Sequence, residues 1–76
     1  MASAVVLLRV DTDAQRGIIE DIRSYAGVME ANYLFGPYDM YIKIHADTEE
    51  GIHNLVLDKI RRIEGIKSTT TCFIAD

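Results

Sequence analysis

The chain has 76 residues, of which 49% are hydrophobic and 26% charged, and its formal net charge is −4. A chain of this length holds one small domain, 1–76, and for so small a core oligomers are a common remedy. An acidic domain gains nothing from counterion release, and its apolar runs fall short of the roughly 20 residues of a membrane span, so we expect no direct nucleic-acid or membrane binding.

Residues 3–10 are predicted to form the first strand, because they are aliphatic and β-branched and a polar run follows them. The apolar side chains divide between its two faces, with Val5 and Leu7 on one and Val6, Leu8 and Val10 on the other. A helix follows, in which Thr12 and Gln15 have the spacing of a capping box and Gly27 comes just past the end.

The middle of the chain predicts a β-hairpin. Its strands are 28–35 and 40–46, and the residues Gly36-Pro37-Tyr38-Asp39 between them are typical of a tight turn. A second helix begins near Thr48, with Glu49 and Glu50 at its positive end, and a last strand spans 66–74 after Gly65. The order predicts an α+β, ferredoxin-like βαββαβ fold, a four-stranded antiparallel sheet with two helices on one face.

The other face of this sheet has no cover within the chain. It carries spare aliphatic surface from the first strand, and we assign to it the apolar row Met29, Ala31, Tyr33 and Phe35 of the second strand. Exposed apolar surface of this extent usually marks an interface. We therefore expect a dimer that forms through the sheets, of the dimeric α+β barrel type.

Few residues suggest catalysis or metal binding. His45 and His53 lie on different elements without Cys or carboxylates at metal-ligand spacing, so we expect solvated structural roles for both. Cys72 has no predictable base beside it and is expected to be a buried, inert thiol, and a single cysteine fits a cytoplasmic protein. We expect no catalytic residue, no metal and no cofactor.

Polar residues in the hairpin turn and in the last strand could have either a structural or a ligand-binding role. Asp39 either stabilises the turn by accepting nearby backbone N–H groups, or presents its carboxylate to an ammonium group. Thr69 and Thr71 are good strand formers, but alternate hydroxyls share one face and could receive a polar ligand.

Four short motifs follow one another along the chain: Gly27-Val28, Gly36-x-Tyr38-Asp39, Ile63-x-Gly65-Ile66 and Thr69-x-Thr71. In this combination they resemble the effector-binding domain of the Lrp/AsnC (feast/famine) transcription regulators, which is also called the RAM domain. The resemblance spans essentially the whole chain. It implies dimers that assemble into rings, commonly octamers, with small amino acids bound at the interfaces between dimers.

The resemblance also implies a set of ligand-binding residues. Asp39 would take the amino group, while backbone N–H groups and hydroxyls would take the carboxylate. The residues that would border the pocket are Gly36, Tyr38, Asp39, Thr69 and Thr71, with Tyr33 and Leu34 as candidates for the side-chain part.

One departure from the family pattern is that nothing precedes the first strand, where full-length regulators carry a helix-turn-helix domain. A start at Met1 favours a stand-alone protein over an excised domain, although an excised domain would look identical. Such a module would sense amino acids or join full-length relatives in mixed assemblies. The alternatives are a structural assembly partner that has lost its ligand, and a small dimeric α+β-barrel enzyme, a monooxygenase or isomerase.

Overall fold

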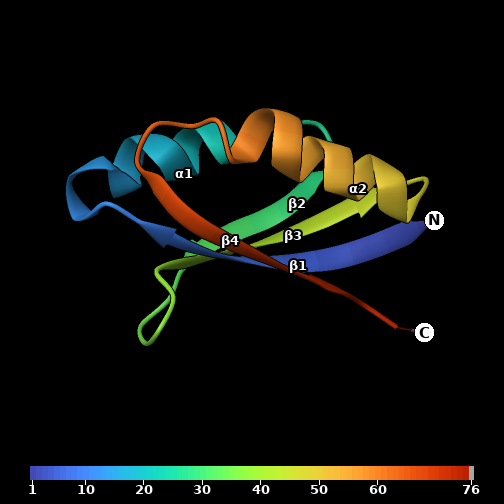
Figure 1. Cartoon of the computed structure of the whole chain (residues 1–76), viewed down its shortest axis with the longest axis horizontal. Coiled ribbons are helices and arrows are strands. Elements are labelled where there is room, and N and C mark those ends of the chain that lie inside the picture. Colours follow the sequence, from blue (N-terminus) through green and yellow to red (C-terminus); the bar gives the residue numbers. More distant parts are fainter. Residues whose placement is uncertain (76) are drawn as a thin grey trace.

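The computed structural model describes residues 1–75, which form a four-stranded antiparallel sheet with two helices on one face (Figure 1). The elements in chain order are β1 (Ala2–Val10), the 3₁₀ turn η1 (Thr12–Ala14), α1 (Gln15–Arg23), β2 (Val28–Tyr33), β3 (Met40–Ala46), α2 (Glu49–Leu55), the π-helical turn η2 (Val56–Ile60) and β4 (Ile66–Phe73). The strand order across the sheet is β2-β3-β1-β4. The predicted βαββαβ, ferredoxin-like fold is confirmed.

The core lies between the sheet and the helices. Helix α1 packs over β2, and α2 packs over β1 and β3. Alternate residues of the two central strands supply one side of the core and helical isoleucines the other. The side chains without exposed surface are Ala4, Val6, Leu8, Met40, Ile42, Ile44, Ile22, Ile52 and Ile60.

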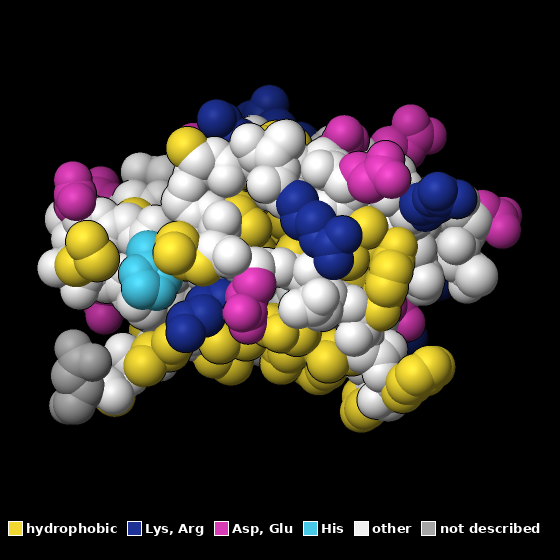
Figure 2. Space-filling model, turned by 180° about the vertical axis from the view of Figure 1, so that it is seen from behind, with side chains coloured by type: hydrophobic (Ala, Val, Ile, Leu, Met, Phe, Trp, Pro, Cys, Tyr) yellow, Lys and Arg dark blue, Asp and Glu magenta, His cyan; other side chains and the backbone are white. Residues whose placement is uncertain are grey.

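The strand register defines a second surface, which we call the outer face, on the side of the sheet away from the helices. Because register partners point to the same side, each row of partners crosses the sheet on one face. The outward strand residues are Ser3, Val5, Leu7, Arg9, Glu30, Asn32, Tyr41, Lys43, His45, Ser68, Thr70 and Cys72. Figure 2 shows hydrophobic side chains gathered along the bottom of the view, on the side of the molecule away from the helices.

The prediction for the apolar row of β2 is wrong. Ala31 lies in the core as the partner of Ile42, and Tyr33 is the partner of buried Met40, so both face the helices. Met29 falls in the register shift between Val28 and Glu30, and Phe35 lies beyond the end of the strand. The predicted alternation holds only for residues 30–33, and nothing within β2 indicates which of its faces the helices cover.

The two helices begin in different ways. Thr48 caps α2 as expected, since its Oγ1 accepts the backbone N–H of Gly51 at 3.0 Å. The capping box predicted for Thr12 and Gln15 is wrong, because Thr12 lies in a 3₁₀ turn and α1 starts at Gln15 without a side-chain cap. Within residues 1–75, no helix combines the length and the hydropathy needed to cross a bilayer.

This difference predicts unequal costs for two similar substitutions. Thr48→Ala should lower the free energy of unfolding by about 1 kcal/mol, because the Gly51 N–H loses its acceptor. Thr12→Ala is the matched control and should change it by less than about 0.5 kcal/mol. Urea unfolding at one fixed protein concentration measures both values, and equal losses would contradict the assignment of the cap.

Glycines end both helical regions as predicted. Gly27 and Gly65 have φ angles of 93° and 101°, which other residues rarely adopt. A Cβ on Gly65 would also lie 2.9 Å from the Cβ of Ala14, so the chain that enters β4 passes close to η1. In between, the Arg61 N–H donates to the Val56 carbonyl at 2.8 Å, the bond that closes the π-helical turn.

Candidate functional site

Asp39 joins the hairpin to the centre of the sheet through three hydrogen bonds. Its backbone N–H donates to the Leu8 carbonyl at 2.8 Å, and its carbonyl accepts the Leu34 N–H at 2.9 Å. Its carboxylate Oδ2 accepts the Val10 N–H at 2.8 Å. Backbone and side chain are therefore both fixed at the junction of β1, β3 and the loop.

The carboxylate of Asp39 takes the place of a missing strand residue. Pairing of β1 with β3 ends at Leu8 and Met40, while β1 continues to Val10. A part-buried N–H without an acceptor is costly, and Oδ2 supplies that acceptor. The predicted stabilising role of Asp39 thus agrees with this bond. The prediction that its carboxylate accepts an N–H group of the turn itself is wrong, since the donor lies 29 residues away in sequence. A carboxylate has about four acceptor positions, so one such bond leaves capacity for a ligand.

The loop between β2 and β3 spans 34–39 rather than the predicted 36–39. It extends to the side of the sheet away from the helices (Figure 1). Leu34 and Tyr38 are half-buried, Gly36 has a φ of 136°, and Phe35 is fully exposed. Pro37 cannot donate to a strand partner, which helps to end the pairing early.

Thr69 and Thr71 lie on β4, at the edge of the sheet beyond β1. Thr69 is the register partner of Leu8 and Thr71 that of Val6, so both lie on one face, as their spacing predicted, and that face is the helix side. They are only half-buried, because the helices pack over the other three strands. Both threonines are therefore accessible to a molecule that approaches the β4 edge.

The candidate residues form two separate groups within one chain. One row of register partners runs from Tyr33 through Met40 and Leu8 to Thr69, across all four strands. Three strand spacings of about 4.8 Å put its two ends roughly 14 Å apart. Tyr33 and Leu34 thus belong to one end of the row and the threonines to the other, while Asp39 lies between them, bonded to β1. A single small ligand could not contact Tyr33 and the threonines together within one chain.

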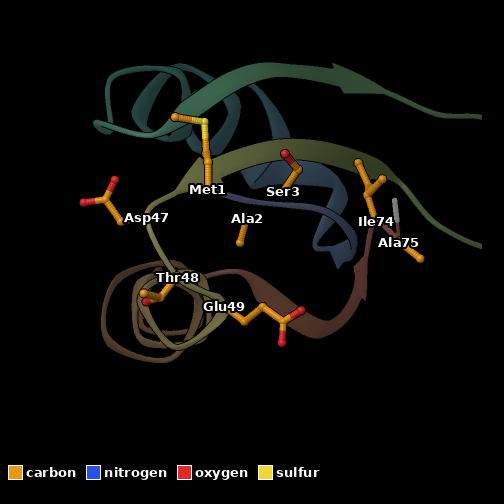
Figure 3. A pocket seen from close by; sticks show the side chains of 8 residues that line it. All are labelled: Met1, Ala2, Ser3, Asp47, Thr48, Glu49, Ile74 and Ala75. Atoms are coloured by element: carbon orange, nitrogen blue, oxygen red, sulfur yellow. The ribbon is translucent and has the colours of Figure 1, made fainter.

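Three hollows lie on the described surface, and none of the three is lined by a candidate residue. One of about 390 Å³ is bordered by residues 1–3, residues 74–75 and the start of α2 (Figure 3). Its lining residues are Met1, Ala2, Ser3, Asp47, Thr48, Glu49, Ile74 and Ala75. Two more, of about 570 Å³ and 380 Å³, border η1 and the segment before β4. No sequence motif marks these hollows, since they arise where separate elements meet.

The residues that would be needed for catalysis lie apart. His45 is on the outer face of β3, whereas His53 is exposed on α2, on the opposite side of the sheet. Neither histidine lines any of the three hollows. Within residues 1–75 no cluster of His, Cys, Asp and Glu has the arrangement of a metal site. The expected burial of Cys72 is wrong, because it points outward from the edge strand and is exposed.

Known proteins resemble this chain in sequence and in structure. An uncharacterised HTH-type transcriptional regulator of Pyrococcus abyssi is 35% identical over 72 residues, which cover 91% of this chain and 48% of the relative. The chain thus spans about half the length of that relative.

Two solved structures show the same fold. A Thermus thermophilus protein matches with a TM-score of 0.95 and 26% identity, over 100% of this chain and 95% of that one. A Neisseria meningitidis transcriptional regulator in complex with L-Met matches with a TM-score of 0.90 and 17% identity, over 99% and 50%. The family model of the Lrp/AsnC ligand binding domain matches residues 3–76. The chain therefore belongs to the family of Lrp/AsnC ligand-binding domains.

Proposed function

We propose that this chain is an amino-acid-binding, self-assembling regulatory module, which responds to a small free amino acid and acts through assembly rather than through catalysis. Membership in a family of ligand-binding domains supports the regulatory role. The Neisseria meningitidis regulator that shares this fold was solved as a complex with L-Met, which supports the ligand class. The net charge of −4 favours an effect on protein partners over direct contact with DNA.

One observation carries the proposal: the two groups of candidate residues lie at opposite edges of one sheet. Tyr33 and Leu34 are at the β2 edge, Thr69 and Thr71 are on the β4 edge, and Asp39 lies between the edges, where it is bonded to β1. When two copies meet with unlike edges, the loop of one chain comes next to the threonines of the other. The pocket that the sequence motifs suggest is then an interface between subunits, bordered by Gly36, Tyr38 and Leu34 as well.

The chemistry of the two groups suits the two charges of a free amino acid. The Asp39 carboxylate can accept from an ammonium group, a charge-assisted bond worth on the order of 1.5–3 kcal/mol. Its rigid position, held by Val10, Leu8 and Leu34, reduces the cost of ordering the site. The Thr69 and Thr71 hydroxyls can donate to the ligand carboxylate across the interface.

The outer face provides the first step of assembly. Val5 and Leu7 are half-exposed near its centre, and two sheets packed face to face would bury them. A specific interface of this kind typically buries about 800 Å² per subunit. We propose a dimer through this face, rings of such dimers through the sheet edges, and mixed assemblies with full-length regulators in the cytoplasm.

Isothermal titration of the 76-residue chain with each of the twenty amino acids tests the ligand role. We expect saturable binding of at least one small amino acid at or below millimolar concentration. Absence of binding by every amino acid at millimolar concentration would reject the effector role. If the chain then still co-purified with a helix-turn-helix regulator, it would be a structural assembly partner.

A further inference from the structure

The outer face carries one acidic and one lysine side chain directly opposite each other. Glu30 of β2 and Lys43 of β3 are register partners. Glu30 is the one acidic residue among the outward residues of the four described strands. The other titratable side chains of basic type on this face, Arg9 and His45, cannot neutralise a lysine. Glu30 is therefore the counter-charge that this surface offers.

Glu30 is held by a tyrosine instead of by this lysine. The Tyr41 hydroxyl donates to Glu30 Oε1 at 2.9 Å and accepts from Asn32 Nδ2 at 3.0 Å. Within residues 1–75 the ion pairs closer than 4 Å are Arg16–Glu20 and Lys67–Asp11. The Lys43 ammonium is thus without an acidic partner in its own described chain, and the Glu30 carboxylate is oriented in advance.

A lysine in this position needs a partner once the face is covered. Burying an ammonium without a counter-charge is strongly unfavourable, and Lys43 is already half-buried in the single chain. A two-fold axis brings the same patch of both copies together, so that each contact occurs twice. A patch with Glu30 and Lys43 side by side is self-complementary under that operation.

We propose that Lys43 pairs with Glu30 of the partner subunit in both directions, and that these reciprocal pairs select an identical copy as the partner and fix how the two sheets are oriented. The inference rests on the dimer of the proposed function and adds the residues that decide which chains pair. Tyr41 and Asn32 are positioning residues in this arrangement, because they hold the Glu30 carboxylate.

The charge swap Glu30→Lys with Lys43→Glu, made in one chain, tests the proposal. The doubly swapped chain has the same composition and the same net charge of −4, and it keeps an opposite-charge pair within each sheet. It should form dimers with itself. With the wild-type chain it would set like charges against each other in both contacts, so mixed dimers should be rare.

Native mass spectrometry of ¹⁵N-labelled wild type mixed with the unlabelled swapped chain counts the three dimers. Random pairing would make about half of the dimers mixed, and we expect a fraction at least about tenfold lower. A mixed fraction near one half would overturn the inference. A mixture of labelled and unlabelled wild type is the control, because mixed dimers must make up about half of its dimers once subunits have exchanged. If this control gave monomers alone, the dimer of the proposed function itself would fail.

Discussion

Asp39→Asn is expected to weaken amino-acid binding by about 10- to 150-fold, which is the loss of one charge-assisted hydrogen bond. The amide oxygen of Asn can still accept the Val10 N–H that Asp39 Oδ2 accepts at 2.8 Å. The free energy of unfolding should therefore stay within about 1 kcal/mol of the wild-type value. Calorimetric titration and urea unfolding of the same preparation measure the two effects.

Asp39→Ala is the matched comparison, because it removes both the charge and the acceptor. It should lose binding to a similar degree and also lower the free energy of unfolding by about 1–3 kcal/mol, since the Val10 N–H is left without its partner. If Asp39→Asn bound the ligand as tightly as wild type, the carboxylate would serve only the junction of β1 and β3. The charge would then have no part in recognition.

Leu7→Asp is expected to raise the dissociation constant of the dimer by at least about 100-fold. Leu7 is the partner of Tyr41 on one side and of Thr70 on the other, at the centre of the outer face. The substitution removes apolar area from the interface and puts an uncompensated carboxylate of each chain into it. Sedimentation velocity over a dilution series measures the constant.

Leu57→Asp provides the control for this substitution. Leu57 is 36% exposed on the helix side of the molecule, so an aspartate there should leave the dimer unchanged. Circular dichroism of both variants checks that the sheet and helices are intact. Equal dimerisation of Leu7→Asp and wild type would show that the outer face is not the interface.

The element order could be predicted because local signals mark it. Alternating aliphatic residues, the glycines at 27 and 65 and the Thr48 cap are all recognised from neighbours in sequence. Which face of each strand is covered by the helices could not be predicted from such local signals. The predicted environments of Ala31 and Cys72 are both wrong, since their orientation depends on the register with β3 and β1.

The candidate site shows the same division between local and long-range information. Motif spacing picked out Asp39 and the two threonines, and it predicted the shared face of Thr69 and Thr71 correctly. The Val10 bond to Asp39 gives no sequence signal, because Val10 acts through its backbone N–H, which every residue except proline has. The distance across the sheet between the two groups also follows only from the strand order.

Mixing two complementary variants tests most directly whether one ligand site is built from two chains. One variant is Asp39→Asn, and the other carries Thr69→Val together with Thr71→Val, which removes both hydroxyls at nearly constant shape. Each alone should bind the amino acid weakly, because every one of its sites lacks one half. The same holds for any mixture if the site lies within a single chain.

A site shared between subunits gives a different result. Random assembly of the two variants joins an intact Asp39 with intact threonines in about a quarter of the sites. Calorimetric titration of the mixture should then recover wild-type affinity at about a quarter of the wild-type binding capacity. If the wild-type chain binds the amino acid but the mixture of the two variants shows no recovery of binding, the site is not completed by a second copy.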